Sequence, residues 1–177
     1  MTPRTMRRET DLMIDFEKEL QDRTRLVNEA IEKFLPDEEG PQKTILSACN
    51  YSVRNGGKRL RPIFMECAYR LSGGRDMEKL YPLMTALEMI HSSSLVHDDL
   101  PCMDNDELRR GKPSTWARFG VDMGTLAGDG LMIYAFETGL KSELPEDVRL
   151  RAIRILAEKS GIFGMIGGQT VDVELTG

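Results

Sequence analysis

Four aspartates stand within nine residues in the run Asp98–Asp106, which closes a long apolar stretch of the sequence. Isolated buried charges are costly unless they are paired or bound to a metal, so these carboxylates cannot pack into a core. The fold must therefore place them at the mouth of a cavity. A divalent cation would relieve their mutual repulsion, and Mg²⁺ binds one or two carboxylates while substrate phosphates complete its shell.

A proline inside the acidic run decides how its carboxylates can meet. On an unbroken helix Asp98 and Asp104 would lie roughly 240° apart. Pro101 must bend or open the helix, which lets Asp104 turn back towards Asp98. Two other interpretations stay open, an exposed acidic turn and a calcium loop. The calcium loop lacks the glycine required at its sixth position, where Arg109 stands, and no glutamate follows at the twelfth.

Apolar residues elsewhere recur at three- and four-residue spacing, which is typical of amphipathic helices. No segment of five or more residues alternates as a strand would. The sequence predicts one all-α domain over residues 1–177, with breaks at clusters of glycine and proline. The expected helices cover about residues 9–34, 43–53, 62–71, 77–100, 121–140 and 145–175.

Composition limits the function classes. The 177-residue chain has a net charge of −5, so general nucleic-acid binding is not expected. Its three cysteines are odd in number and show no CxxC spacing, which favours reduced thiols and a cytoplasmic location. The basic N-terminus is followed by no apolar segment, so we expect neither a signal peptide nor a membrane span.

A basic cluster lies at Gly56–Pro62, just before an expected helix. Lys58, Arg59 and Arg61 stand next to two glycines, and the unpaired N–H groups of a helix start add to their positive potential. The cluster is either a diphosphate seat or a solvated basic turn. The residues alone leave both interpretations open.

Three further polar residues stand within apolar helical segments. His91 precedes Asp98 by seven residues, or two helical turns, so both point to the same side. His91 is either a structural histidine or part of the site. Asp129 and Gln169 are either satisfied buried polar groups or residues that line the site, Gln169 then as a substrate-binding residue.

Six motifs occur in an order that resembles the trans-isoprenyl diphosphate synthases, of the farnesyl or geranylgeranyl diphosphate synthase kind. The resemblance covers about residues 10–175 and the N-terminal part of such an enzyme. The motifs are GGKRLRP (56–62), MIH (89–91), LVHDDLPCMDND (95–106), RRGKP (109–113), LAGD (126–129) and GMIGGQ (164–169).

The resemblance implies an antiparallel helical bundle around a deep central cavity, the isoprenoid synthase fold, and usually a homodimer. It implies condensation of isopentenyl diphosphate with an allylic diphosphate. Asp98 and Asp104 would bind Mg²⁺, with Mn²⁺ as an alternative, Asp99 would support them, and Arg109 would hold the allylic diphosphate. The residues implied for isopentenyl diphosphate are Lys58, Arg61, His91 and Arg110.

The sequence departs from the family pattern in two respects. Trp116 stands where the family usually has histidine. The family's second aspartate-rich motif and its Lys-Thr pair are not among the 177 residues. We therefore expect an N-terminal portion, with the fold incomplete at its C-terminus and no turnover by this chain alone. A non-catalytic or regulatory partner subunit is the alternative, and a terpene cyclase is disfavoured by Lys58, Arg61 and Arg110.

Product length in this family depends on the residues just before the first aspartates, where bulky aromatics stop chain growth. Here these residues are Ser93 and Ser94, which are both small. We expect the cavity floor to be open at this level, so that the product can exceed C15. Met84 and Leu87, a turn or two deeper, are the alternative floor.

Overall fold

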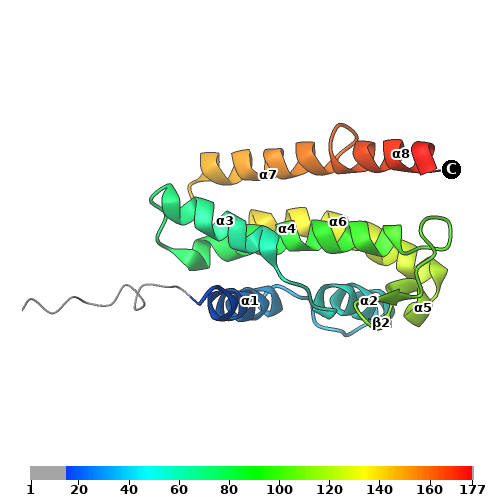
Figure 1. Ribbon diagram of the computed structural model, residues 1–177. Coiled ribbons are helices and arrows are strands. Elements are labelled where there is room, and N and C mark those ends of the chain that lie inside the picture. Colours follow the sequence, from blue (N-terminus) through cyan, green and yellow to red (C-terminus); the bar gives the residue numbers. More distant parts are fainter. Residues whose placement is uncertain (1–14, 177) are drawn as a thin grey trace, which may run out of the picture.

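The computed structural model describes residues 15–176, most of which lie in helices (Figure 1). The all-α prediction is confirmed. The helices are α1 (Phe16–Glu32), α2 (Lys43–Arg54), α3 (Leu60–Leu71), α4 (Met77–Asp98), α5 (Thr115–Phe119), α6 (Val121–Leu140), α7 (Glu146–Ser160) and α8 (Met165–Thr176).

Helix α4 is the centre of the molecule. It packs along α6 and also contacts α1, α2, α3 and α7. Because α4 has neighbours on most sides, it is apolar around most of its circumference rather than along one stripe. In Figure 1, α7 and α8 run above α4 and α6, while α1, α2 and α5 lie below them. The main core unites α4 with these neighbours and is formed by Val27, Ile31, Val53, Ile63, Leu80, Leu83, Met84, Ala86, Met89, Ile90, Leu131 and Ala135.

The last expected helix is wrong in one respect, because it is broken in two. Helix α7 ends at Ser160 and α8 begins at Met165. Gly164 lies so close to the carbonyl group of Lys159 that a side chain there would collide with the backbone. This tight turn therefore depends on glycine. Helix α8 follows this turn, and several of its residues line a cavity.

A short β-hairpin and the short helix that follows it were not predicted from the sequence. Strands β1 (Leu108–Arg109) and β2 (Lys112–Pro113) form a small antiparallel hairpin, and helix α5 follows it directly. Arg110 and Gly111 at the hairpin turn both have positive φ, 55° and 76°, as in a type I′ turn. Such short elements contain too few residues to show a periodic pattern.

Helix α1 begins at Phe16, and the Asp15 carboxylate accepts a hydrogen bond from the backbone N–H of Lys18 at 3.2 Å. The expected helical residues 9–14 and the basic N-terminus lie outside the described residues. None of the helices formed by residues 15–176 combines the length and apolar character needed to cross a bilayer.

Candidate functional site

A cavity of about 610 Å³ lies among α3, α4, α6 and α8 and is called here the apolar cavity. Methionine, isoleucine and leucine side chains form much of its wall, with Asp98 and Arg61 among its charged residues. The cavity expected between helices is therefore present. Its lining comprises Arg61, His91, Ser94, Leu95, His97, Asp98, Met103, Met132, Met165, Ile166, Gln169, Thr170, Val173 and Glu174.

A second cavity of about 420 Å³, called here the basic cavity, adjoins the first. Arg61 and His91 line both cavities, so the two lie side by side at these side chains. The structure thus brings together all four residues that the resemblance implied for isopentenyl diphosphate. The basic cavity is lined by Gly57, Lys58, Arg59, Leu60, Arg61, Glu88, His91 and Arg110.

His91 stands where the two cavities meet. Its burial, and next the positive charge of Arg61, lower the pKa of His91 below its ordinary value. Arg110 lowers the pKa further, while the carboxylate of Glu88 opposes the shift. His91 is therefore neutral near pH 7 and can donate one hydrogen bond without adding charge.

Arg59 does not join the other cations at the surface of the basic cluster. Its side chain is 3% exposed and forms an ion pair with Glu88 at 2.8 Å. Of the three cations in the cluster, Arg59 is therefore the buried one. Arg59 has a φ of 49°, and this backbone conformation directs its side chain into the protein. Lys58 and Arg61, on either side of it, remain exposed.

Arg110 reaches the basic cavity from the β1–β2 turn and packs on the backbone of Gly57. An ideal Cβ at Gly57 would lie 2.8 Å from the guanidinium group of Arg110, and Gly57 has a φ of +127°. Any other residue would be strained there and would displace Arg110. The glycine pair therefore makes room for a cation as well as a turn.

The acidic loop folds back on the end of α4. The backbone N–H of Asp104 donates to the carbonyl oxygen of Asp98 at 2.9 Å, and that of Asp106 donates to Asp99 at 3.1 Å. The predicted return of Asp104 towards Asp98 is confirmed. Burial, and next the negative charge of Asp104, raise the pKa of Asp98.

Asp99 has a different environment from Asp98. It is 2% exposed and accepts hydrogen bonds from Nε of Arg109 at 2.9 and 3.2 Å and from Nη2. The bond to Asp99 raises the pKa of Arg109, which stays charged. Arg109 lines neither the apolar nor the basic cavity, so its guanidinium group is positioned by Asp99 beside the acidic loop.

The carboxylates can be tested for their fit to Mg²⁺. Among residues 15–176 no three His, Cys, Asp or Glu side chains form a group that could hold a metal ion. Asp98 and Asp104 form a two-carboxylate pair, in which burial, and next the charge of Asp104, raise the pKa of Asp98. Such a pair fits Mg²⁺, which needs only one or two carboxylates when phosphates are present.

A family model described as polyprenyl synthetase matches residues 42–176 of the chain. The chain belongs to the polyprenyl synthetase family. It is 44% identical over 164 residues to a farnesyl diphosphate synthase from Geobacillus stearothermophilus, covering 91% of this chain and 54% of that relative. It is 44% identical over 167 residues to large subunit 1 of a heterodimeric geranylgeranyl pyrophosphate synthase from Arabidopsis thaliana, covering 92% of this chain and 44% of that subunit.

The crystal structure of an FPP/GFPP synthase from Zymomonas mobilis matches the fold with a TM-score of 0.83 and 38% identity. The match covers 89% of this chain and 57% of that structure. The isoprenoid synthase fold is thereby confirmed. The chain spans about half the length of the relatives that it matches.

The two serines expected to control product length, Ser93 and Ser94, have different surroundings in the structure. Ser94 lines the apolar cavity. Ser93 is fully buried, donates its hydroxyl to the carbonyl oxygen of Ile90 at 2.8 Å, and does not line either cavity. Of the two serines, Ser94 is therefore the one placed to limit the cavity.

Gln169 and Asp129 also separate. Gln169 lines the apolar cavity from α8. Asp129 has a side chain that is 65% exposed and lies 3.3 Å from Nε2 of His97. Asp129 is neither buried nor part of the cavity lining, and it instead links α6 to α4.

Trp116 binds the acidic loop. Its indole Nε1 donates to the carbonyl oxygen of Asp106 at 3.0 Å. This hydrogen bond links α5 to the acidic loop. Helix α2 supports the same region, since Tyr51 donates to the carbonyl oxygen of Pro113 at 2.7 Å and Asn55 to that of Arg109 at 3.2 Å.

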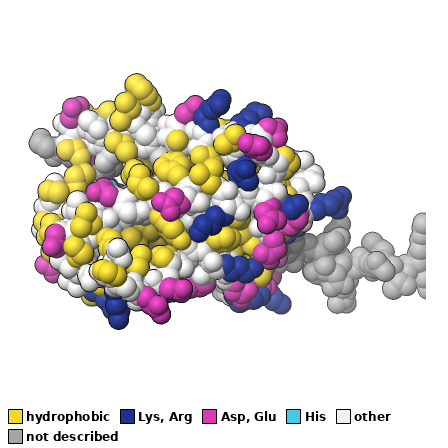
Figure 2. Space-filling model, turned by 180° about the vertical axis from the view of Figure 1, so that it is seen from behind, with side chains coloured by type: hydrophobic (Ala, Val, Ile, Leu, Met, Phe, Trp, Pro, Cys, Tyr) yellow, Lys and Arg dark blue, Asp and Glu magenta, His cyan; other side chains and the backbone are white. Residues whose placement is uncertain are grey.

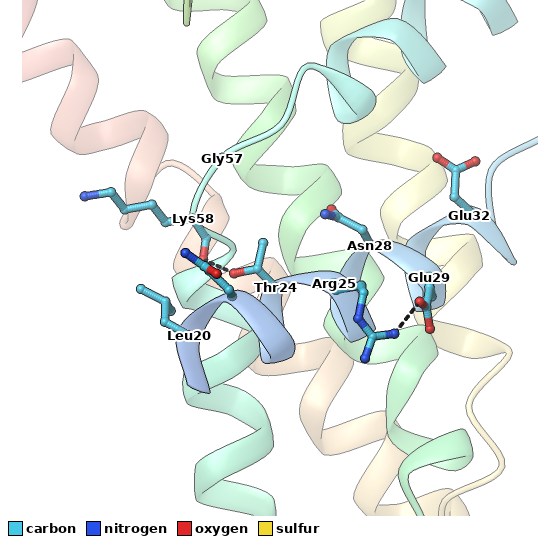
Figure 3. A pocket seen from close by; sticks show the side chains of 9 residues that line it. Leu20, Thr24, Arg25, Asn28, Glu29, Glu32, Gly57 and Lys58 are labelled. Atoms are coloured by element: carbon cyan, nitrogen blue, oxygen red, sulfur yellow. Dashed lines mark hydrogen bonds and ion pairs between the residues drawn. The ribbon is translucent and has the colours of Figure 1, made fainter. Parts of the chain in front are cut away.

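A third hollow, a groove of about 590 Å³, runs along α1 beside the segment Gly57–Lys58 (Figure 3). The hydroxyl of Thr24 donates to the carbonyl oxygen of Lys58 at 3.3 Å. Figure 3 shows the Lys58 side chain extending away from α1. Helix α1 therefore holds the backbone of Lys58, while the Lys58 side chain points away from α1.

The sequence analysis missed Glu88, which lines the basic cavity among cations. Glu88 precedes His91 by three residues, so the two lie on one face of α4. That spacing was the available signal. A glutamate on the same face as His91 could have indicated that one cation of the basic cluster forms an ion pair with it.

Proposed function

We propose that this chain carries the diphosphate-binding part of a prenyltransferase that condenses isopentenyl diphosphate with an allylic diphosphate. One observation carries the proposal, the convergence of Lys58, Arg61, His91 and Arg110 on the basic cavity. The basic cavity lies beside an apolar one, which suits a ligand with a charged head and a hydrocarbon tail. Lys58, Arg61 and Arg110 would bind the diphosphate of isopentenyl diphosphate, and neutral His91 would donate a hydrogen bond.

The reaction breaks the C–O bond of the allylic diphosphate, and the isopentenyl double bond attacks the resulting carbocation. A proton then leaves the new chain, and the departed diphosphate accepts it. Met103, Met132 and Met165 line the cavity and would keep water from the cation. Asp98 and Asp104 would hold Mg²⁺, which neutralises charge developing on the leaving diphosphate when it is bound.

We propose that the 177-residue chain binds diphosphates but does not turn them over, because it contains one aspartate-rich motif. The test is a fusion of this chain to the remaining half of the Geobacillus relative. Incubation with isopentenyl and allylic diphosphates and Mg²⁺ should give prenyl diphosphate with the fusion and none with the chain alone. A folded fusion without product would contradict the proposed function.

The proposed product is longer than C15, because the small side chain of Ser94 leaves the apolar cavity open near Asp98. Chromatography of the products formed by the fusion would test this. Exclusive C15 product would contradict it.

We further propose a homodimer formed through α6. Leu126, Ile133 and Leu140 are seven residues apart and 49%, 62% and 48% exposed, so they form an apolar stripe along the helix. Apolar side chains also cover much of the face shown in Figure 2. The second candidate is a subunit of a heterodimer, which is favoured by the similarity to the Arabidopsis large subunit.

We also propose that the protein works in the cytoplasm. Cys49, Cys67 and Cys102 are all free thiols in the structure. Fractionation of the host cell, with detection of the native protein, would test this location.

A further inference from the structure

Arg59, in the basic cluster Gly56–Pro62, has an unusual backbone conformation. Its backbone is left-handed, with φ 49° and ψ 33°, which is uncommon for a residue with a side chain. It directly precedes α3, and its carbonyl oxygen accepts the backbone N–H of Ile63 at 3.2 Å. The conformation of Arg59 therefore sets the direction in which the chain leaves Lys58 and enters α3 with Arg61.

Three partners from three helices hold the guanidinium group of Arg59. Nε donates to Oδ1 of Asn28 on α1 at 2.9 Å, Nη1 donates to Glu88 on α4 at 2.8 Å, and Nη2 donates to the carbonyl oxygen of Val53 on α2 at 2.6 Å. All three nitrogens are thus engaged in a planar fork that Lys could not reproduce. The side chains of Arg59 and Glu88 are each 3% exposed.

Among the described residues that line the basic cavity, Glu88 is the one acidic residue. Its charge is directed to Arg59 in the cavity wall, where it balances the one cation that does not face solvent. The cations left for a ligand are Lys58, Arg61 and Arg110. The ion pair with Glu88 therefore gives Arg59 a structural role, while Lys58 and Arg61, one and two residues away, stay available to bind a ligand.

We propose that Arg59 and Glu88 are positioning residues, whose ion pair holds Lys58 and Arg61 in the geometry that binds a diphosphate. This inference rests on the proposed function, because it assigns a role within the same site. Both residues line the basic cavity, but their charged groups pair with each other in its wall. The pair acts by fixing the backbone between α2 and α3.

The inference makes a prediction opposite in sign to simple electrostatics. Replacing Glu88 with Gln removes a negative charge beside an anion site, so Coulomb's law alone predicts tighter binding. Loss of positioning predicts weaker binding, by about tenfold if one charge-assisted hydrogen bond to the diphosphate is lost.

The experiment is calorimetric titration of the 177-residue chain with inorganic pyrophosphate and with isopentenyl diphosphate, each in Mg²⁺. The variants are Glu88→Gln and Arg59→Lys. Because Glu88→Gln leaves a buried unpaired guanidinium group and can unfold the chain, a third variant, Asn28→Ala, removes only the partner on α1. Asn28 is exposed and does not line the basic cavity.

Two control variants match these changes. Glu66→Gln removes another buried carboxylate, paired with Arg70 at 2.8 Å and with Arg23 at 3.1 Å, away from both cavities. Gln21→Ala shortens an exposed side chain on the same α1 groove as Asn28. Circular dichroism at the titration temperature confirms that each variant is folded.

Weaker binding of both ligands by folded Asn28→Ala and Arg59→Lys, with native affinity in the controls, supports the inference. Native affinity in Asn28→Ala and Arg59→Lys, or tighter binding by folded Glu88→Gln, overturns it and leaves the proposed function standing. No binding by the native chain contradicts the proposed function and this inference together.

Discussion

The backbone N–H of Asp104 donates a hydrogen bond to the carbonyl oxygen of Asp98, with 2.9 Å between nitrogen and oxygen. This bond closes the loop that Pro101 opens and returns the second carboxylate to the end of α4. The negative charge of Asp104 then contributes to the raised pKa of Asp98. The chain holds two like charges together at some cost to its own stability, as expected of a site prepared for a cation.

Asp98→Asn should stabilise the protein without metal. The folded pKa of Asp98 is raised, so its contribution to stability is present at low pH and is lost as pH rises through that pKa. At pH 7 the neutral amide avoids this loss, and we expect the thermal midpoint to rise by roughly 2 °C. Thermal denaturation in EDTA would measure it, with exposed Asp22→Asn as the control. A lower midpoint for Asp98→Asn at pH 7 would show that the repulsion is not there.

His91 should make stability depend on pH below neutrality. Its folded pKa is lowered by burial and by Arg61, so the unfolded state takes up a proton more readily. Native stability should therefore fall as pH drops below about 6.5, the ordinary value of histidine. In urea denaturation between pH 8 and 5, His91→Gln should show a flatter decline than the native protein. Parallel curves would be evidence against a depressed pKa.

The two serines before the acidic run should respond differently to an added ring. Ser93→Phe enlarges a fully buried side chain and should lower the free energy of unfolding by about 1–3 kcal/mol. Ser94→Phe places the ring in the apolar cavity, so it should leave stability closer to native and shorten the product of the fusion enzyme. Chemical denaturation and product chromatography test the pair. Unchanged products from Ser94→Phe would remove that serine from the control of chain length.

The apolar stripe on α6 should hold the proposed dimer. Ile133→Glu places a charge in the middle of the stripe. Because an isologous interface uses the same surface of both subunits, the dimer would bury two such charges. We expect a monomer by analytical ultracentrifugation at concentrations where the native chain is dimeric. Leu71→Glu changes an apolar residue on α3 that is even more exposed, and it should leave the dimer intact. A native chain that is monomeric throughout would argue against this dimer.

Much of the fold was predictable because local signals mark its boundaries. The segment 121–140 was predicted and is the helix α6, since glycine precedes it and a polar loop follows. The break between α7 and α8 was not predictable in the same way. Glycines also occur inside α6, so Gly161 and Gly164 gave no unique signal for a turn.

In the candidate site, too, features set within one helix could be predicted, and contacts between helices could not. His91 and Asp98 share a face because they share a helix, and sequence spacing is enough to predict this. The inward turn of Arg59 depends on Glu88, Asn28 and Val53, which come from other helices. A tertiary contact of this kind leaves no periodic signal near Arg59, so the basic motif alone suggested three equivalent cations.

Calorimetric titration with isopentenyl diphosphate in Mg²⁺, comparing the native chain with Arg110→Ala, most directly tests the basic cavity as a diphosphate site. The account predicts saturable binding by the native chain and binding about tenfold weaker or more by the variant, because a charge-assisted hydrogen bond is lost. Arg25→Ala, an exposed arginine on α1, should bind as the native chain does. Equal affinity of native and Arg110→Ala proteins, or no binding by the native chain, would contradict the account.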